Sequence, residues 1–281
     1  MHLDDIAQHK VFKVAPDGSL DLALVLMEEH GIRHLPVVED GSLVGMLSDR
    51  DLLCTIGGPG RGEREAPATP FPAGPTRVAH VMSRPVRHLA PEDPVARAAR
   101  LMLREKISAV PLVRDGALVG LVTETDVLRC VATADRLEHD ASWRFEKVED
   151  HMTTHVFRIE SGELPYAAWR LMHRKAIQHL LVVNGSDVVG IVSDRDIRGW
   201  FSGARRNGAE ACEPSPTTLV RDIMTTPIRT VGSATPLANA ASQMAQLKIG
   251  ALPVHRSGRV VGVISETDLL KRLVSALEHT Q

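Results

Sequence analysis

The stretch GLVTETDVL, residues 120–128, decides how this chain is built. A short apolar run ends in a hydroxyl residue, Thr123, and a carboxylate, Asp126, follows three positions later, where the apolar residues take up helical spacing. The same pattern occurs four times, as GMLSDRDLL, GLVTETDVL, GIVSDRDIR and GVISETDLL, starting at residues 45, 120, 190 and 262. Four copies of one strand-to-helix junction indicate a protein made of internal repeats.

A hairpin is expected directly before each junction, because two short apolar runs are separated there by a turn of two residues. The predicted turns are Asp40–Gly41, Asp115–Gly116, Asn184–Gly185 and Ser257–Gly258. Aspartate or asparagine followed by glycine tolerates positive φ at both turn positions, which is a strong hairpin signal. A helical pattern precedes each hairpin, and in the second repeat its buried face is predicted to be Val95, Ala98, Ala99 and Met102. The sequence therefore predicts an α/β protein of four β-α-β-β-α units.

Boundaries between the repeats follow from composition. The repeats are expected at residues 1–56, 78–133, 147–201 and 219–281. Residues 57–77, rich in glycine and proline, and residues 202–218 are predicted to be linkers, and residues 134–146 a helical connector. The first and third repeats share SDRD, whereas the second and fourth carry TETD and SETD, so the simplest history is the duplication of a two-repeat module. The functional body is expected to be a pair of repeats, used twice.

Composition and charge narrow the range of functions. The chain has 281 residues, 43% of them hydrophobic, and a formal net charge of -2, so no basic patch for nucleic acid is indicated. No apolar run approaches the roughly 20 residues that span a bilayer, and no secretory signal pattern is present, so a cytoplasmic protein without a membrane partner is expected. Some histidines lie four residues apart, but no third ligand follows at suitable spacing, so no metal site is predicted.

The order of these elements resembles the CBS domain family. The resemblance rests on an apolar strand with Leu-Pro or Val-Pro, a hairpin, the junction G-h-h-[ST]-x-x-D (h, apolar) and a helix, and it covers nearly the whole chain apart from the linkers. It implies four CBS repeats, paired into two Bateman modules in a disc-like assembly. The chain is similar to stand-alone prokaryotic CBS proteins and to the regulatory subunit of AMP-activated kinase, which implies adenine nucleotides in central clefts.

The junction residues suit a ribose and a phosphate. A carboxylate accepts hydrogen bonds from both vicinal hydroxyls of a ribose, and the candidates are Asp51, Asp126, Asp196 and Asp268. A hydroxyl beside the free NH groups of a helix N-terminus suits an anion, and the candidates are Ser48, Thr123, Ser193 and Ser265. The alternative is purely structural, because a hydroxyl residue followed three positions later by an acid is also close to a capping box.

Positive charge for the phosphates is distributed unevenly. The resemblance implies that two residues before the Leu-Pro or Val-Pro of each hairpin face the centre of the assembly. These are Arg33 and His34, Ser108 and Ala109, Gln178 and His179, and Gly250 and Ala251. The first and third repeats are polar or basic there and the other two are not, so each pair could combine a basic wall from its odd repeat with the hydroxyl and carboxylate of its even repeat.

Two arginines and two departures from the pattern qualify this assignment. Arg50 and Arg195, inside SDRD, are candidate phosphate contacts or else surface or ion-paired arginines. The third repeat has Leu180–Leu181 where the others have a proline, and the first repeat lacks the motif M-[ST]-x-[PH] that begins at residues 82, 152 and 224. Both departures count against the sites at Asp51 and Asp196.

Three classes of function are compatible with these residues. The leading hypothesis is a ligand-sensing regulatory protein in which AMP, ADP or ATP changes how the repeats pack, with no cofactor required. An enzyme is not expected, because no nucleophile elbow, HExxH, dinucleotide fingerprint or phosphate loop occurs. The alternatives are a docking or dimerisation module without ligand, and a sensor of S-adenosylmethionine or a cyclic dinucleotide. Expected partners are the adenosyl ligand, a second copy in a homodimer, and a regulated enzyme, kinase or transporter.

Overall fold

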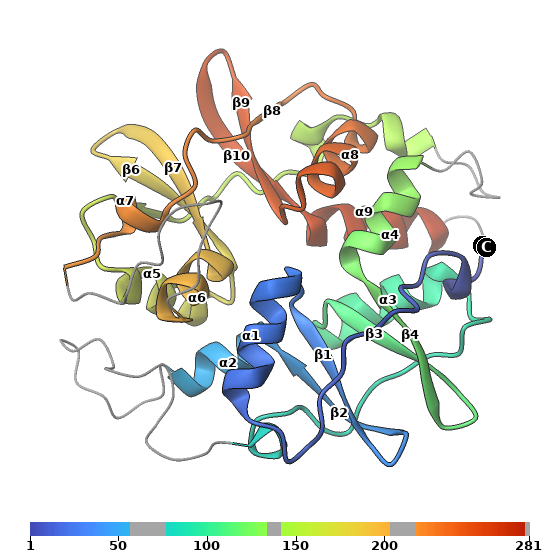
Figure 1. Ribbon diagram of the computed structural model, residues 1–281. Helices are drawn as coiled ribbons and strands as arrows, with labels where there is room; N and C mark the ends of the chain where they lie inside the picture. Colours follow the sequence, from blue (N-terminus) through green and yellow to red (C-terminus); the bar gives the residue numbers. More distant parts are fainter. Residues whose placement is uncertain (57–76, 134–141, 203–216, 279–281) are drawn as a thin grey trace. The chain divides into compact units, whose positions relative to one another are not determined.

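A computed structural model describes residues 1–56, 77–133, 142–202 and 217–278 (Figure 1). Most of the predicted linkers over 57–77 and 202–218, and much of the connector over 134–146, lie outside these ranges. The first repeat contains α1 (Leu20–His30), β1 (His34–Glu39), β2 (Ser42–Ser48) and α2 (Asp49–Ile56). The second contains α3 (Val95–Glu105), β3 (Ala109–Arg114), β4 (Ala117–Thr123) and α4 (Glu124–Thr133).

The third and fourth repeats follow the same order with an added first strand. The third contains β5 (Arg158–Glu160), α5 (Pro165–Lys175), β6 (His179–Asn184), β7 (Asp187–Ser193) and α6 (Asp194–Ser202). The fourth contains α7 (Val220–Ile223), β8 (Val231–Gly232), α8 (Leu237–Leu247), β9 (Ala251–Arg256), β10 (Arg259–Ser265) and α9 (Glu266–Glu278). Short 3-10 turns lie at Leu3–Asp5, Val78–His80, Ser142–Phe145 and Val148–Asp150. The predicted α/β fold of four repeats is confirmed.

The first strand differs in length from one repeat to the next. In the first and second repeats it is reduced to single parallel bridges, Val14 to Val37 and Leu89 to Leu112. In the third repeat Leu181 stands where the others have proline, and its NH donates to the Phe157 carbonyl at 3.2 Å, a bond that proline cannot make. The departure Leu180–Leu181 therefore supports the longer strand β5.

The hairpin turns have the predicted geometry in three repeats. Asp40 and Gly41 both have positive φ, at 48° and 81°, as do the corresponding residues of the second and fourth repeats. In the third repeat the prediction is wrong by one residue, because β6 extends to Asn184, which pairs with Asp187. Gly185, with φ of 61°, and Ser186 therefore form that turn.

Two compact units, each made of distant segments, contain the repeats. We call Met1–Val11, Arg87–Val156 and Arg229–Gln281 the even unit, because it holds the helices and hairpins of repeats two and four. The odd unit, Phe12–Val86 and Phe157–Ile228, holds those of repeats one and three. Each unit has its own apolar core. The even core includes Val95, Ala98, Ala99 and Met102, the face predicted for α3.

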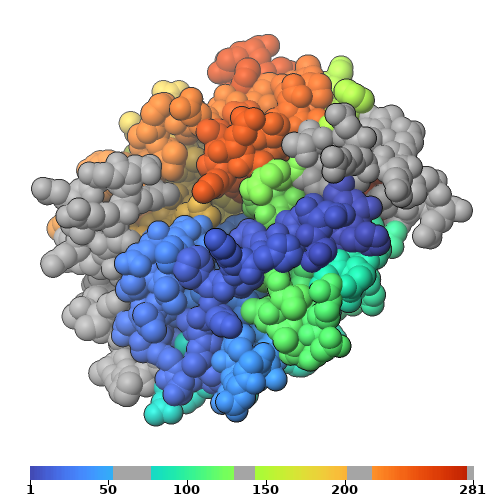
Figure 2. Space-filling view, turned by 45° about the vertical axis from the view of Figure 1, so that its right-hand side comes forward, coloured from blue at the N-terminus to red at the C-terminus, as the bar shows by residue number. Residues whose placement is uncertain are grey.

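The segment that leads into each repeat pairs with the hairpin of a neighbouring repeat. Gln8 exchanges backbone hydrogen bonds with Leu121, at 2.9 and 3.0 Å, so the N-terminal residues lie against the second repeat (Figure 2, dark blue against green). Equivalent bridges join Ser83 to Met46, Thr153 to Val263 and Thr225 to Ile191. Each of these bridges lies within one compact unit, because the lead-in segment belongs to the same unit as the hairpin that it pairs with.

A methionine in three of these lead-in segments packs against the first glycine of the junction motif. A Cβ added to Gly262 would lie 2.6 Å from Met152 Sδ and 2.9 Å from the Thr153 carbonyl oxygen. The equivalent Gly120 is more open, because the lead-in segment of the first repeat has Ala7 instead of methionine. A Cβ added to Gly120 would lie 3.4 Å from the Ala7 Cβ.

We therefore expect Gly262→Ala to lower the free energy of unfolding by about 1 to 3 kcal/mol, because the backbone oxygen cannot move aside without disturbing the bridge. Gly120→Ala is the matched control and is expected to change the stability by less than about 0.5 kcal/mol. Urea unfolding midpoints of both variants measure the difference. Equal midpoints for the two alanine variants would show that the methionine contact does not constrain the fold.

Candidate functional site

The four strand-to-helix junctions share one hydrogen-bond geometry. The aspartate Oδ2 accepts from both the NH and the hydroxyl of the residue three positions earlier. The NH and hydroxyl distances are 2.8 and 2.6 Å for Ser48–Asp51, 2.9 and 2.6 Å for Thr123–Asp126, 2.7 and 2.9 Å for Ser193–Asp196, and 3.1 and 2.6 Å for Ser265–Asp268. The aspartate NH returns a bond to the same hydroxyl at 3.3 to 3.4 Å. The capping interaction weighed as the structural alternative is thus present at all four junctions.

The second carboxylate oxygen distinguishes the two junctions of the even unit. At Asp268, Oδ1 receives a 3.4 Å contact from Lys271, whose side chain is 64% exposed. At Asp126, Gln8 Nε2 donates to both oxygens, at 3.3 and 3.1 Å, and Arg129 approaches Oδ1 at 3.4 Å. Asp126 is consequently 3% exposed. A ligand hydroxyl reaches Asp126 only if Gln8 moves, whereas Asp268 is covered by one exposed lysine.

Gln8 is a site residue that sequence reasoning missed. It stands where the other lead-in segments have the hydroxyl residue of M-[ST], namely Ser83, Thr153 and Thr225. The first repeat lacks the M-[ST] motif, and Gln8 in its place contacts Asp126 at the junction of the second repeat. The missing motif was the sequence signal that this segment differs from the other three.

The hairpin register places the predicted central residues beside the junctions. His34, Ala109, His179 and Ala251 each pair directly with the junction hydroxyl residue of their own repeat. The residue before each of them accepts a hydrogen bond from the first NH of the following helix, at 2.9 Å for Arg33 and 3.0 Å for Ser108, Gln178 and Gly250. These pairs therefore lie at the helix N-termini, and their facing the centre of the assembly stays a prediction.

The odd unit gathers a dense group of charges at its two junctions. Burial, together with the positive charge of nearby Arg33, lowers the pKa of both His34 and His179 to about 4. Burial, reinforced by the negative charge of Asp49, raises the pKa of Asp194 to about 6. These mutual effects show that the predicted cations of repeats one and three lie within electrostatic reach of each other. Arg50 and Arg195 belong to the same group.

Arg198, which was not predicted, is the buried counter-charge of two carboxylates in the odd unit. Its side chain is 3% exposed, and it donates to Glu28 at 3.0 Å and to Asp49 at 2.6 Å. Burial alone would raise the pKa of Asp49, but the attraction of Arg198, with His34 and Arg33, brings it below its ordinary value. An arginine of the third repeat is thereby ion-paired to two helices of the first. The other three repeats have leucine at this position.

Within the described residues, the cations at the junctions of the even unit are Arg129 and Lys271, which each contact their own junction aspartate at 3.4 Å and are 56% and 64% exposed. Glu124 and Glu266 are buried at the helix starts, and Thr125 Oγ1 donates to Glu266 at 2.8 Å. Before their hairpins, the even repeats have no charged residue at the two positions that Arg33 and His34 occupy in the first repeat. The residues there are Ser108, Ala109, Gly250 and Ala251. The predicted combination of an odd basic wall with an even junction draws residues from both compact units and stays a prediction.

The described part of the chain shows neither a metal-ligand cluster nor a membrane-spanning helix. No group of three or more histidine, cysteine, aspartate or glutamate side chains there could hold a metal ion. None of the helices in residues 1–56, 77–133, 142–202 and 217–278 has the length and apolar character needed to cross a membrane.

Four helix-hairpin-helix repeats with capped [ST]-x-x-D junctions define a four-repeat α/β protein. The model of the CBS domain family matches residues 3–58, 78–133, 148–203 and 220–275, which together exceed half of the chain. The chain therefore belongs to the CBS domain family and carries four CBS domains.

Similarity to individual proteins extends over nearly the full length. The uncharacterised protein MJ1225 of Methanocaldococcus jannaschii is 30% identical over 277 residues, covering 95% of this chain and 96% of that protein. The crystal structure of MJ1225, described as a proposed archaeal homologue of γ-AMPK, superposes with a TM-score of 0.80 and 26% identity over 97% of this chain and 100% of that one. An uncharacterised protein from Pyrococcus horikoshii shares the fold, with a TM-score of 0.64, 22% identity, and coverage of 97% of this chain and 100% of that one.

Proposed function

We propose that this CBS-domain protein is a regulatory protein that senses an adenine nucleotide, AMP, ADP or ATP, at its strand-to-helix junctions. The observation that carries the proposal is the carboxylate of Asp268. Its Oδ2 is fixed by Ser265, whereas the contact recorded for Oδ1 is an exposed lysine 3.4 Å away. A carboxylate oriented in advance accepts a hydrogen bond from a ribose hydroxyl without paying to be ordered.

The remaining groups fit the other parts of such a ligand. The dipole at the start of α9 favours a phosphate there. The Ser265 hydroxyl donates to Asp268 Oδ2 and would bind a phosphate oxygen only after releasing that bond. In the odd unit, positive charge comes from Arg33, Arg50 and Arg195. His34 is uncharged at pH 7, because its pKa is lowered to about 4, and can offer only a neutral ring nitrogen. Binding that favours one packing of the repeats over another would shift the equilibrium between them, which is what a sensor requires. The likeness to MJ1225 supports a regulatory role. As part of the proposal, the chain forms a homodimer and regulates an enzyme, a kinase or a transporter.

A thermal-shift series tests the ribose assignment. AMP, ADP and ATP are expected to raise the melting temperature of the native chain, since a ligand that binds only the folded form adds RT ln(1 + [L]/Kd). In the double variant Asp126→Asn with Asp268→Asn, affinity is expected to fall roughly 10- to 100-fold, because each charge-assisted bond contributes about 1.5 to 3 kcal/mol. Asn keeps a capping acceptor while removing the charge.

Asp222→Asn is the matched control for lost capping. Asp222 Oδ2 accepts from the Leu219 NH at 2.8 Å, as a cap of α7 outside the four junctions. This variant is expected to retain the full ligand shift. Unchanged nucleotide affinity in the double variant would remove the ribose role. A shift with S-adenosylmethionine or cyclic di-AMP but not with nucleotides would change the ligand class.

A docking module without ligand is the second candidate. The complete capping boxes favour it, because they explain the four junctions without any ligand. The exposed apolar side chains Phe12, Leu22 and Val25 of the first repeat, 42%, 53% and 47% exposed, also suit a protein contact. The absence of any shift across the ligand series, on folded protein, would favour this function.

A further inference from the structure

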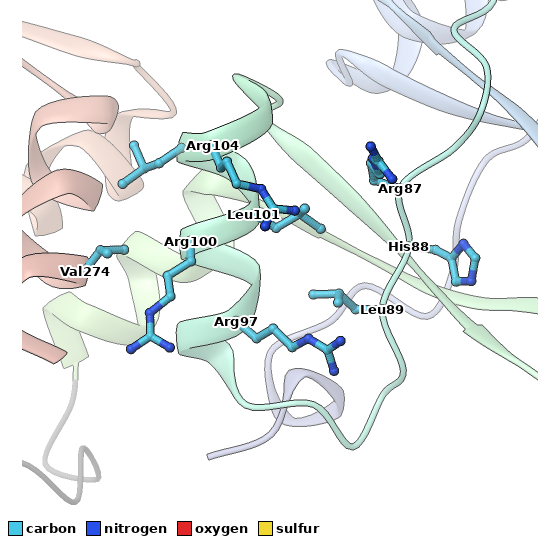
Figure 3. A pocket seen from close by; sticks show the side chains of 9 residues that line it. Arg87, His88, Leu89, Arg97, Arg100, Leu101, Arg104 and Val274 are labelled. Carbon is cyan, nitrogen blue, oxygen red and sulfur yellow. The ribbon is translucent and has the colours of Figure 1, made fainter. Parts of the chain in front are cut away.

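A cavity of about 710 Å³ in the even unit is lined by cations (Figure 3). Its walls come from the segment Arg87–Leu89, from α3 and from α9. Four of the lining residues are arginines, Arg87, Arg97, Arg100 and Arg104, and His88 is a fifth basic group; none of those recorded is acidic. The volume is in the range of small-molecule sites. None of these residues belongs to a strand-to-helix junction.

Nearby carboxylates neutralise only part of this charge. Arg97 pairs with Asp93 at 2.6 Å, and Glu105 is shared by Arg104 at 3.1 Å and Arg87 at 3.8 Å. Among the described residues, four guanidinium groups against these two carboxylates leave an excess of two positive charges. The arginines of these pairs are 58% to 73% exposed, so the pairs are weak competitors for a multivalent anion.

Arg100 provides a second, independent observation. Its Nε is buried and has no hydrogen-bond partner among the described residues. A buried donor left without an acceptor costs free energy, and an anion in the cavity would supply the acceptor. In Figure 3, Arg100 extends on the side of α3 that faces Val274, whereas Arg97 extends toward the segment carrying Leu89.

The arginines are not inherited from the repeated scaffold. At the positions of Arg97, Arg100 and Arg104, the helix of the fourth repeat has Asn239, Ser242 and Gln246, and that of the first has Leu22, Val25 and Glu29. The fold therefore forms without basic residues there. In the third repeat two arginines stand at matched positions, Arg170 and Arg174, but Ala167 and Phe157 replace the other two.

We propose that this cavity binds a small polyanion that carries two or more linked phosphate groups. Guanidinium groups on α3 at positions i, i+3 and i+7 lie along one rigid helix and present paired NH donors that match phosphate oxygens. Leu89 and Leu101, which extend into the gap between the segment and the helix, form an apolar floor that limits access of water. A single monovalent anion would leave most of the excess charge unmatched.

Isothermal titration of the full chain with inorganic triphosphate tests this site. Saturable binding at one site per chain is expected, weaker at 300 mM than at 50 mM salt because screening reduces the attraction. Arg97→Gln with Arg100→Gln and Arg104→Gln is expected to weaken binding at least about 100-fold, and Arg100→Gln alone about tenfold. The single change keeps the test valid if the triple variant does not fold.

Arg170→Gln with Arg174→Gln is the matched control, since it removes two arginines from the same helix positions of the third repeat. It is expected to bind triphosphate as the native chain does. Asp126→Asn with Asp268→Asn should also bind it unchanged, so failure of the nucleotide proposal and failure of this one are distinguishable. No saturable binding of triphosphate, or an equal loss in the Arg170 and Arg174 control, would overturn the proposal.

Discussion

Replacement of Arg198 by leucine is expected to lower the free energy of unfolding of the odd unit by about 3 to 5 kcal/mol. The guanidinium is 3% exposed and is held by Glu28 and Asp49. Its removal leaves the Asp49 carboxylate, whose side chain is 9% exposed, buried without its nearest counter-charge. Leucine fits the same position in the other three repeats, so the loss reports the unpaired carboxylate and not the shape of the side chain.

Tryptophan fluorescence can follow this effect in one unit. In a Trp143→Phe background, the remaining tryptophans, Trp169 and Trp200, both belong to the odd unit. Urea unfolding of Arg198→Leu is compared there with Arg174→Leu, an exposed arginine of the same unit that is expected to change stability by less than about 0.5 kcal/mol. Adding Asp49→Asn to Arg198→Leu should recover part of the loss. An unaltered midpoint for Arg198→Leu would show that the ion pairs contribute nothing net.

Acidification from pH 7 to pH 4 is expected to destabilise the odd unit by about 2 to 4 kcal/mol. His34 and His179 have pKa values of about 4 in the folded chain, below the unfolded value of about 6.5. Their contribution to stability is complete above pH 6.5 and is lost as the pH falls toward 4, because the unfolded chain binds protons first. Asp194, with its pKa raised to about 6, has the opposite sign and offsets part of this loss.

The double variant His34→Gln with His179→Gln isolates the histidine contribution. Urea midpoints measured at pH 7, 6, 5 and 4, again in the Trp143→Phe background, should fall much less with acid than those of the parent. His173→Gln is the control, because that histidine is exposed on α5 of the same unit. A pH slope that survives the double substitution would assign the acid sensitivity to carboxylates instead.

The sequence predicted features that depend on neighbouring residues. The turn Asp40–Gly41, the buried face of α3 and the hydroxyl-carboxylate spacing of the junctions are local patterns, and the structure confirms each of them. The turn of the third repeat was misplaced by one residue because Asn184 fits the end of a strand as well as a turn.

Features that depend on distant residues could not be predicted in the same way. The sequence around Arg198 does not indicate that this arginine is buried, because its partner Glu28 lies 170 residues away. Gln8 covers Asp126 across 118 residues, and the missing M-[ST] motif marks its segment as different without naming Asp126 as the partner. The gathering of repeats one and three in one compact unit, and of two and four in the other, likewise depends on packing between helices and not on spacing along the chain.

The interleaving of the two units has a consequence for how the chain folds. The chain changes unit four times, near residues 11, 86, 156 and 228, so neither unit is a continuous stretch. Closing either core requires contacts across well over 100 residues, such as Thr125 with Glu266, 141 residues apart. Such high contact order favours slow folding, on the scale of milliseconds to seconds. A ribosome must therefore synthesise most of the chain before either core can close, and a half-length fragment would leave both cores incomplete.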